Sequence, residues 1–436
     1  MQIQCEITGL SHDGAGVGRV DGKVVFVPGA LPGETVLITP GQSKKGVTQA
    51  SLDAVLSPSA QRVTPPCAQA ARCGGCALQI ADAALQAQLK TAQVRDAMAR
   101  IAKLNVDVRE IRSMDEPWRY RNKGIFHADY ASGRTRLGFF EKGSHELVPA
   151  ADCLLFSTQV NALAAWLEDA ITATGTSGGI TKVMIRESHA NGEMMVVFVT
   201  SAQKFRQQTL VDRLQSEWPQ VVSIWHNVNT NPRLMLGRAY TLLAGKSTIR
   251  ESLGACHYEL SPASFFQVNT VQAEVLYQCG KDLLPDLAPD ATILDLYCGI
   301  GTIGSFIAAP GQRLIGVDSV GQAIDDAKQA ARANVLANAH FYTAKAEQWL
   351  PKWLAKGNHA DLAIIDPPRK GCDHKLLDAL ITAHIPHILY ISCNPATLAR
   401  DLTHLAPHYT ISPLQPVDLF PQTSHTESVV GLERKG

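Results

Sequence analysis

The feature that most constrains the fold is a series of short apolar runs in the C-terminal third of the chain. These runs predict strands over residues 291–296, 313–317, 339–343, 361–365 and 387–391. A helical pattern separates the second run from the third, over residues 320–336. Strands that alternate with helices form βαβ units, which build a parallel sheet with helices on its faces. The sequence therefore predicts an open α/β domain.

Two of these strand ends carry residues suited to a nucleoside. The first strand runs into DLYCGIGTIG, which holds Gly299 and Gly301, and the second ends at Asp318. In a Rossmann-like domain such glycines let the backbone approach the ligand, and the carboxylate binds the ribose hydroxyls. The pattern D-x-x-C-G-x-G lacks the G-x-G-x-x-G loop that a dinucleotide needs. It favours S-adenosylmethionine over NAD, and it argues against an NAD-dependent oxidoreductase.

Three later segments place reactive side chains at the same edge of the predicted sheet. Cys393 follows the apolar run 387–391 in SCNP, and Pro395 suits the first turn of a helix. Asp366 follows the previous strand in DPPRK, and Glu427 lies near the C-terminus in SHTES, after His425. A helix N-terminus favours a thiolate, so we expect Cys393 to be an exposed, activated thiol. Taken alone, Cys393 would more often be a small buried residue; the neighbouring segments favour a catalytic edge.

The ten cysteines are expected to be thiols or metal ligands rather than disulfides, because no export signal is recognisable. Cys67, Cys73 and Cys76 lie within PPCAQAARCGGC, and Cys153 is the nearest remaining cysteine for a fourth ligand. The spacing fits zinc and an iron–sulfur cube equally well. The compartment is therefore expected to be reducing, most simply the cytoplasm, and no apolar run is long enough to cross a membrane. The net charge of zero gives no indication of a nucleic-acid partner.

The N-terminal residues 1–58 predict a compact β-barrel of the oligonucleotide-binding type. Short alternating runs are separated by glycine-rich stretches, including GAGVGR at 14–19 and PGQSKKG at 40–46, which we interpret as loops. Four Lys or Arg stand against five Asp or Glu here, so RNA binding rests on architecture alone. Residues 112–142 are the basic patch, with seven Lys or Arg, four Asp or Glu and interleaved aromatics. That composition is typical of nucleic-acid binding and equally of a solvated sheet.

The motifs in this order resemble those of the bacterial RNA (uracil-5-)-methyltransferases. HDGAGVGR with VFVPGALPGE resembles a TRAM domain, and C-x5-C-x2-C with a distant cysteine resembles a cluster motif. FFQVN, DLYCGIG, DPPRKG, SCNPATLARDL and HTES resemble the catalytic motifs, and the likeness covers nearly the whole chain. Within the family, the chain is most similar to the 23S rRNA group, which has a TRAM domain and an iron–sulfur cluster.

The resemblance implies a class I S-adenosylmethionine-dependent methyltransferase domain and assigns roles to individual residues. It implies that Cys393 is the nucleophile and Glu427 the base. The cofactor-binding residues that it implies are Gln267, Tyr297, Asp318 and Asp366, and Gly299 and Gly301 of the glycine-rich turn complete the expected set. The implied ligands of a 4Fe-4S cluster are Cys67, Cys73, Cys76 and Cys153. The chain departs from the family at Ala344-Lys345-Ala346, where an Asn or Asp often lies near the adenine.

The resemblance also implies a domain plan and a substrate. Residues 1–58 would be the TRAM barrel, 59–80 and 113–260 a central α+β domain with the cluster, and 81–112 and 261–436 the catalytic domain. The expected reaction transfers a methyl group to C5 of a uridine, most simply in 23S rRNA, and the rival target is uridine 54 of tRNA. A non-catalytic RNA-binding protein would leave Cys393 and Glu427 without a role. No protein partner is implied, and we expect a monomer.

Overall fold

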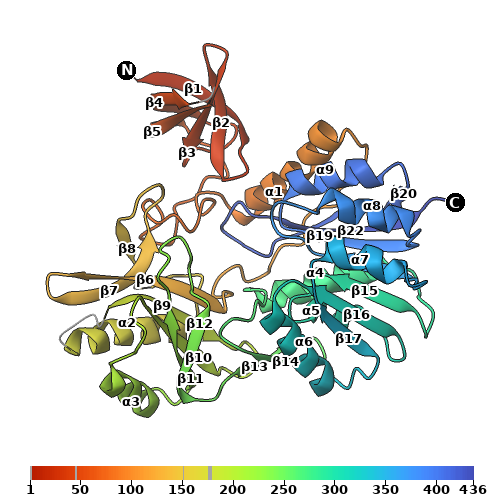
Figure 1. Ribbon diagram of the computed structural model, residues 1–436. Coiled ribbons are helices and arrows are strands. Elements are labelled where there is room, and N and C mark those ends of the chain that lie inside the picture. The colour runs from red at the N-terminus through yellow and green to blue at the C-terminus, as the bar shows by residue number, and fades with distance from the viewer. Residues whose placement is uncertain (1, 45–46, 151, 175–178) are drawn as a thin grey trace.

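Figure 1 shows the computed structural model, in which residues 2–44, 47–150, 152–174 and 179–436 are described. Within these ranges the chain forms a closed barrel, a seven-stranded sheet, an eight-stranded sheet and one separate two-stranded sheet. The barrel contains the N-terminus and stands apart from the two larger sheets in Figure 1. The larger sheets lie side by side, and the eight-stranded sheet holds the candidate site.

The barrel has the strand order β1-β2-β3-β5-β4. Its strands are β1 (Ile3–Leu10), β2 (Ala15–Val20), β3 (Lys23–Pro28), β4 (Thr35–Lys44) and β5 (Val47–Ser57). The predicted barrel is thus confirmed, but the loop interpretation of GAGVGR is wrong, because most of it forms β2. A Cβ atom at Gly18 would lie 2.4 Å from the Cys5 sulfur, and one at Gly16 would lie 2.8 Å from the carbonyl oxygen of Ala30. These glycines therefore permit close strand packing in a narrow barrel. PGQSKKG is likewise largely strand up to Lys44, and residues 45–46 lie outside the described ranges.

The seven-stranded sheet has the order β12-β11-β10-β9-β6-β7-β8. Its strands are β6 (Lys123–Ala131), β7 (Arg134–Phe140), β8 (Leu147–Pro149), β9 (Ile180–Glu187), β10 (Met194–Thr200), β11 (Val221–Val228) and β12 (Ala239–Gly245). Helices α2 (Thr158–Ala173) and α3 (Gln208–Glu217) share one apolar core with it. Met184 and Met195 join a different core, shared with the C-terminal sheet, so the sheet is covered on both faces. The two-stranded sheet, β13 (Ile249–Leu253) and β14 (Cys256–Leu260), packs into that shared core.

The eight-stranded sheet has the order β17-β16-β15-β18-β19-β22-β20, and β21 pairs with β22. Its strands are β15 (Thr292–Leu296), β16 (Arg313–Asp318), β17 (Ala339–Thr343), β18 (Leu362–Ile365), β19 (His387–Ser392), β20 (Tyr409–Ile411), β21 (Gln415–Val417) and β22 (Glu427–Arg434). The first five in this order are parallel, and β22 runs antiparallel to β19. The predicted parallel strands are therefore confirmed. Beyond β19 the sheet continues with antiparallel strands, beginning with β22.

Helices cover both faces of this sheet, as the βαβ pattern predicts. They are α4 (Thr270–Asp282), α5 (Thr302–Ile307), α6 (Gly321–Ala333), α7 (Ala346–Leu354), α8 (His374–Thr382) and α9 (Pro395–Leu405). Helices α4, α5 and α6 contribute to one core, and α7, α8 and α9 contribute to the other. No described helix is long and apolar enough to cross a membrane.

Helix α1 (Ala83–Ala97) lies against the C-terminal sheet although the seven-stranded sheet follows it in sequence. Asp82 caps its N-terminus by accepting a hydrogen bond from the backbone N of Leu85, and a π-helical turn, Met98–Ala102, ends it. Val94 and Met98 are buried in the same core as α9, and Figure 1 shows α1 beside α9. After this turn the chain runs beside β21, where Arg112 makes an isolated bridge with Val417.

Candidate active site

The glycine-rich turn after β15 is clamped to the end of β16. Tyr297 has a φ of +76° and Gly299 one of +53°. A left-handed tyrosine costs on the order of 1–3 kcal/mol and persists only where its surroundings enforce it. Here the backbone N–H groups of Tyr297 and Cys298 both donate to the carbonyl oxygen of Val317, at 2.9 and 3.1 Å. These hydrogen bonds fix the turn against the end of β16, at the carboxyl edge of the sheet.

Asp318 ends β16 and is fixed by the two adjoining turns. Its Oδ2 accepts a hydrogen bond from the backbone N of Gly299 at 3.1 Å, and its Oδ1 accepts one from that of Val320 at 2.8 Å. The carboxylate is thus oriented beside the glycine turn, at the place where a nucleoside binds in open α/β sheets. Gly301 has another position: at φ +81° it is the N-cap of α5, where a Cβ would lie 3.2 Å from the Phe341 ring.

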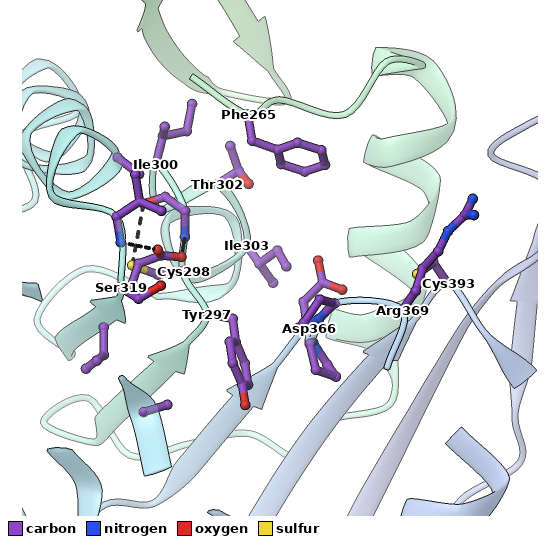
Figure 2. A pocket seen from close by; sticks show the side chains of 18 of the residues that line it. Phe265, Tyr297, Cys298, Ile300, Thr302, Ile303, Ser319, Asp366, Arg369 and Cys393 are labelled. Carbon is purple, nitrogen blue, oxygen red and sulfur yellow. Dashed lines mark hydrogen bonds between the residues drawn. The ribbon is translucent and has the colours of Figure 1, made fainter. Parts of the chain in front are cut away.

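A cavity of about 670 Å³ opens along this edge and brings most of the predicted site together. The predicted residues that line it are Gln267, Tyr297, Gly299, Asp318, Asp366, Cys393 and Glu427. Gly301 is not among the lining residues. Figure 2 shows Asp366, Arg369 and Cys393 on one side of the cavity, and Tyr297, Cys298 and Ser319 on the other. A cavity of this size holds a ligand of cofactor dimensions.

The strand register explains why Cys393 and Glu427 meet. Ser392, the last residue of β19, pairs with Ser428 of the antiparallel β22. Cys393 is the next residue after this pair on one strand and Glu427 is the residue before it on the other, so both lie at the same end of the ladder. Glu427 is 4% exposed and Cys393 is half-buried. Asn394 then caps α9 by accepting a hydrogen bond from the backbone N of Ala396, so the strand-to-helix break falls where SCNP predicts it.

The electrostatics of Cys393 differ from the prediction. The pKa of its thiol is raised to about 11, mainly by burial and also by Glu427 and Asp366, while Arg369 opposes them. The prediction of an exposed thiol activated by the start of α9 is therefore wrong for this state of the protein. The reason is that desolvation and two neighbouring carboxyl groups outweigh the partial positive charge of a helix end. Cys393 is a thiol, not a thiolate, at neutral pH.

The two carboxyl groups beside Cys393 also hold their protons more tightly than usual. Burial raises the pKa of Asp366 to about 7, with a further contribution from Asp295. Burial raises the pKa of Glu427 well above its ordinary value, Asp366 adds to the effect, and Arg369 opposes it. Interacting groups of this kind release their protons as a set. The site therefore places two carboxyl groups of raised pKa next to the thiol.

Arg369 and His425 form the rim of the cavity on the same side. Nη2 of Arg369 lies 3.2 Å from Nε2 of His425. Burial, together with Arg369, lowers the pKa of the His425 imidazole to about 4, so the neutral ring accepts this hydrogen bond. The carbonyl oxygen of Arg369 accepts hydrogen bonds from Asn394 Nδ2 at 3.0 Å and Thr397 Oγ1 at 3.3 Å. The DPPR turn is thus tied to the start of α9.

The four predicted cluster cysteines lie in two loops that come near each other. The pKa of Cys76 is raised to about 12, mainly by burial and also by Cys153, Cys73 and Cys67. The pKa of Cys153 is raised by burial and by Cys73 and Cys67. The donor set, four thiols without a histidine, has the chemistry of a zinc or iron–sulfur site. Among the described residues, however, no three His, Cys, Asp or Glu side chains already form a group that could hold a metal ion.

Several cavity residues were not among the predicted site residues. Phe265 is 61% exposed although it is aromatic, and its ring projects at the cavity in Figure 2. Ala344, Lys345 and Glu347 also line the cavity, and the backbone N of Ala344 donates to the carbonyl oxygen of Asp318 at 2.9 Å. An aromatic residue next to Gln267 in FFQVN was a usable signal for Phe265. For residues 344–347 the signal was the family resemblance, which places the adenine near Ala344-Lys345-Ala346, although these residue types do not themselves indicate a binding site.

The parallel sheet with its crossover helices, the glycine turn and Asp318 at one edge, and a thiol in the same cavity define an S-adenosylmethionine-dependent methyltransferase. Comparison with known proteins narrows this class. The family model described as tRNA (Uracil-5-)-methyltransferase matches residues 83–435, and the TRAM domain model matches residues 3–48. The chain belongs to this family of RNA uracil-5 methyltransferases, and its substrate is RNA.

Two relatives and one solved structure are similar to this chain over nearly its full length. An RNA methyltransferase of Listeria monocytogenes is 38% identical over 99% of this chain and 97% of its own. An RNA methyltransferase of Enterococcus faecalis is 39% identical over 100% of this chain and 98% of its own. The crystal structure of the tRNA (uracil-54, C5)-methyltransferase of Pyrococcus abyssi with S-adenosyl-L-homocysteine is 27% identical. It superposes with a TM-score of 0.77 over 99% of this chain and 100% of that chain.

Proposed function

We propose that this enzyme methylates C5 of a uridine in 23S rRNA, with Cys393 as nucleophile and Glu427 as base. The observation that supports the proposal is that Cys393 and Glu427 both line the cavity that holds the glycine turn, next to the last pair of the β19–β22 ladder, Ser392 with Ser428. A thiol and a carboxyl group at one end of a two-strand ladder can act on adjacent atoms of a small ring.

The chemistry requires both groups. Uracil C5 becomes nucleophilic when the Cys393 sulfur adds to C6, because the electron pair of the C5–C6 bond moves into an enolate. S-adenosylmethionine supplies the methyl group, which C5 attacks while the sulfonium leaves as a thioether. Glu427 then takes the C5 proton, the double bond re-forms, and the Cys393 sulfur leaves as a thiolate. The thiol proton must first leave Cys393, and its neighbouring carboxylates are the acceptors within the site.

Gln267, Tyr297, Gly299, Asp318 and Asp366 are proposed to bind the cofactor. Support comes from their common cavity, and from the fixed orientation of the Asp318 carboxylate beside the glycine turn. Asp366 also lies near the thiol, as its effect on the Cys393 pKa indicates. It is therefore suited to lie between cofactor and pyrimidine. Gly301 is proposed to act indirectly, by letting α5 begin directly after the turn.

The target RNA has two candidates. The resemblance to the rRNA group supports 23S rRNA, and the four cysteines are part of that resemblance. Uridine 54 of tRNA is the second candidate, because the Pyrococcus abyssi enzyme, which acts on that position, matches this chain over its full length. That match includes the barrel, so possession of a TRAM barrel does not by itself distinguish the two targets.

We also propose that Cys67, Cys73, Cys76 and Cys153 hold a 4Fe-4S cluster. Support comes from the donor set and from the mutual effect of the thiols on their pKa values. Bound there, the cluster would supply a rigid cross-link between the 67–76 loop and the 153 loop. The proposed domain plan follows: residues 1–58 and the central residues 59–80 and 113–260 grip RNA, and residues 81–112 and 261–436 carry out catalysis.

One experiment identifies the target. The purified enzyme is incubated with S-adenosylmethionine carrying a labelled methyl group and either 23S rRNA or tRNA from a strain that lacks it. The proposal predicts label in 5-methyluridine of 23S rRNA, with the corresponding site unmodified in the RNA of the deletion strain. Label in tRNA position 54 alone would support the second candidate and reject the first.

A second experiment identifies the nucleophile and the base. Cys393→Ala is expected to give neither methylation nor a covalent complex with RNA. Glu427→Gln is expected to accumulate a denaturant-stable complex that carries the methyl group, because the sulfur adds and the methyl transfers, but the C5 proton stays. Cys372→Ala is the matched control, since Cys372 is a buried thiol that does not line the cavity. Normal turnover by Glu427→Gln would reject the assignment.

A further inference from the structure

The segment that leads to Glu427 is unusual because it is irregular and buried at once. Residues 418–426, which we call the strap, connect β21 to β22 without regular structure. Leu419, Gln422 and Thr426 in this strap are each at most 5% exposed. Loops normally lie at the surface, since a buried backbone without a partner loses hydrogen bonds to water. The strap must therefore obtain its partners from other parts of the chain.

Those partners come from segments far away in the sequence. The carbonyl oxygen of Pro421 accepts a hydrogen bond from the Tyr120 hydroxyl at 3.0 Å. The carbonyl oxygen of Gln422 accepts one from the backbone N of Leu78, just after the cysteine loop, at 2.9 Å. The hydroxyl of Ser424 donates to the carbonyl oxygen of His12 in the barrel at 3.0 Å. Further anchors come from Arg112, whose carbonyl oxygen accepts from the backbone N of Asp418 at 2.9 Å, from α4 and its cap, and from α1.

Lys90 is the first of the anchors on α1. Lys90 is 1% exposed, and its Nζ donates to Asp418 Oδ1 at 2.6 Å and to the carbonyl oxygen of Phe420 at 3.1 Å. Burial lowers the pKa of Lys90 and raises that of Asp418, and each opposes the effect on the other. A buried pair of this kind contributes little net stability, yet loss of one partner is costly. It fixes geometry at the first residue of the strap.

Gln86, one helical turn before Lys90, is the second anchor. Its Nε2 donates to Gln422 Oε1 at 3.0 Å, and its Oε1 accepts from the backbone N of Gln422 at 3.2 Å. Gln422 has a φ of +71°, a conformation that a non-glycine residue holds only when neighbouring groups enforce it. The two-bond clasp from Gln86 is such a constraint, and it lies at the turn of the strap.

We infer that Lys90 and Gln86 of α1 are positioning residues for Glu427: they hold the strap so that the Glu427 carboxyl group reaches the C5 proton. This inference rests on the proposed role of Glu427 as base. Neither side chain lines the cavity, so neither touches substrate or cofactor. Glu427 follows the strap directly and pairs with Val417, the residue just before the strap, so the strap is the loop whose position bears on this side chain.

The test uses the full-length enzyme with its RNA substrate. Lys90→Met and Gln86→Leu are compared with Arg95→Met, which removes a cation from an exposed pair on the same helix, 2.8 Å from Glu110. For the two strap variants we expect kcat to fall by roughly tenfold to a hundredfold, the cost of a misplaced catalytic group. The dissociation constant for S-adenosylmethionine should be unchanged, and the methyl-carrying covalent complex should accumulate. Arg95→Met should behave as wild type.

The readout separates this inference from the assignment of the base. If Glu427→Gln fails to accumulate the complex, the proposed function fails whatever the strap variants do. If Glu427→Gln accumulates it, but folded Gln86→Leu turns over normally, the positioning inference is wrong. Gln86→Leu leaves no buried charge unpaired, so it still tests the positioning inference if Lys90→Met does not fold. Lys90→Met with Asp418→Asn provides a second neutral variant, for which the same complex should accumulate.

Discussion

The raised pKa of Cys393 leads to a quantitative prediction about its reactivity in the free enzyme. With a pKa of about 11, roughly one Cys393 in 3,000 is a thiolate at pH 7.5, whereas about one in ten is ionised in an ordinary cysteine of pKa ~8.5. This lowers the thiolate population about 300-fold. A more basic thiolate is intrinsically about tenfold more nucleophilic over this difference. Alkylation of Cys393 should therefore be about 30-fold slower than in the unfolded chain.

The assay measures alkylation by iodoacetamide between pH 7 and 10, with the Cys393 peptide quantified by mass spectrometry. The same peptide in denatured protein is the reference. Glu427→Gln and Asp366→Asn each remove a negative charge, so they should lower the Cys393 pKa and speed alkylation at pH 9. Arg369→Met should do the opposite. A native Cys393 that titrates near or below pH 8.5, with no change in these variants, would refute the electrostatic account.

Three further predictions concern other parts of the molecule. Burial raises the pKa of Asp295 to about 7, so its contribution to stability is present below about pH 4 and is lost as the pH rises to about 7. We compare the free energy of unfolding of Asp295→Asn with that of wild type at pH 4 and at pH 8. Between these two pH values the variant should gain stability relative to wild type, by up to about 4 kcal/mol for a pKa raised by about three. The same difference in unfolding free energy at both pH values would contradict this. Asp318→Ala should weaken S-adenosylmethionine binding by about 1–3 kcal/mol in calorimetry, and equal affinity would remove Asp318 from the site. Anaerobically purified wild type should contain about four irons, and Cys153→Ser should lose them. One bound zinc in a colourless wild-type protein would reject the cluster.

The sequence was sufficient to predict the parallel sheet and the edge where its ligands lie. Short apolar runs of strand length, followed by glycine, aspartate or proline, mark both the strands and their carboxyl ends. The same local signals predicted that Asp318, Asp366 and Cys393 would meet. For β2 the local signals gave the wrong prediction of a loop. A glycine in a tightly packed strand cannot be told from a glycine in a turn until the residues that pack against it are known.

Properties that depend on distant neighbours were not predictable. The raised pKa of Cys393 comes from burial and from Glu427 and Asp366, which lie on other segments. The strap has the polar composition of a surface loop, and only its partners on α1, near the cysteine loop and in the barrel make it a buried element. Lys90 likewise lies on the inward face of α1, where apolar periodicity gives no reason to expect a cation.

The most direct test of the central claim is the covalent complex with substrate RNA that contains 5-fluorouridine. Fluorine at C5 cannot be removed as a proton, so the reaction must stop after the sulfur has added and the methyl group has transferred. We predict a denaturant-stable complex whose digestion yields the SCNP peptide linked through Cys393 to a methylated fluorouridine. Attachment at a different cysteine, or no complex despite methylation of ordinary RNA, would contradict the account.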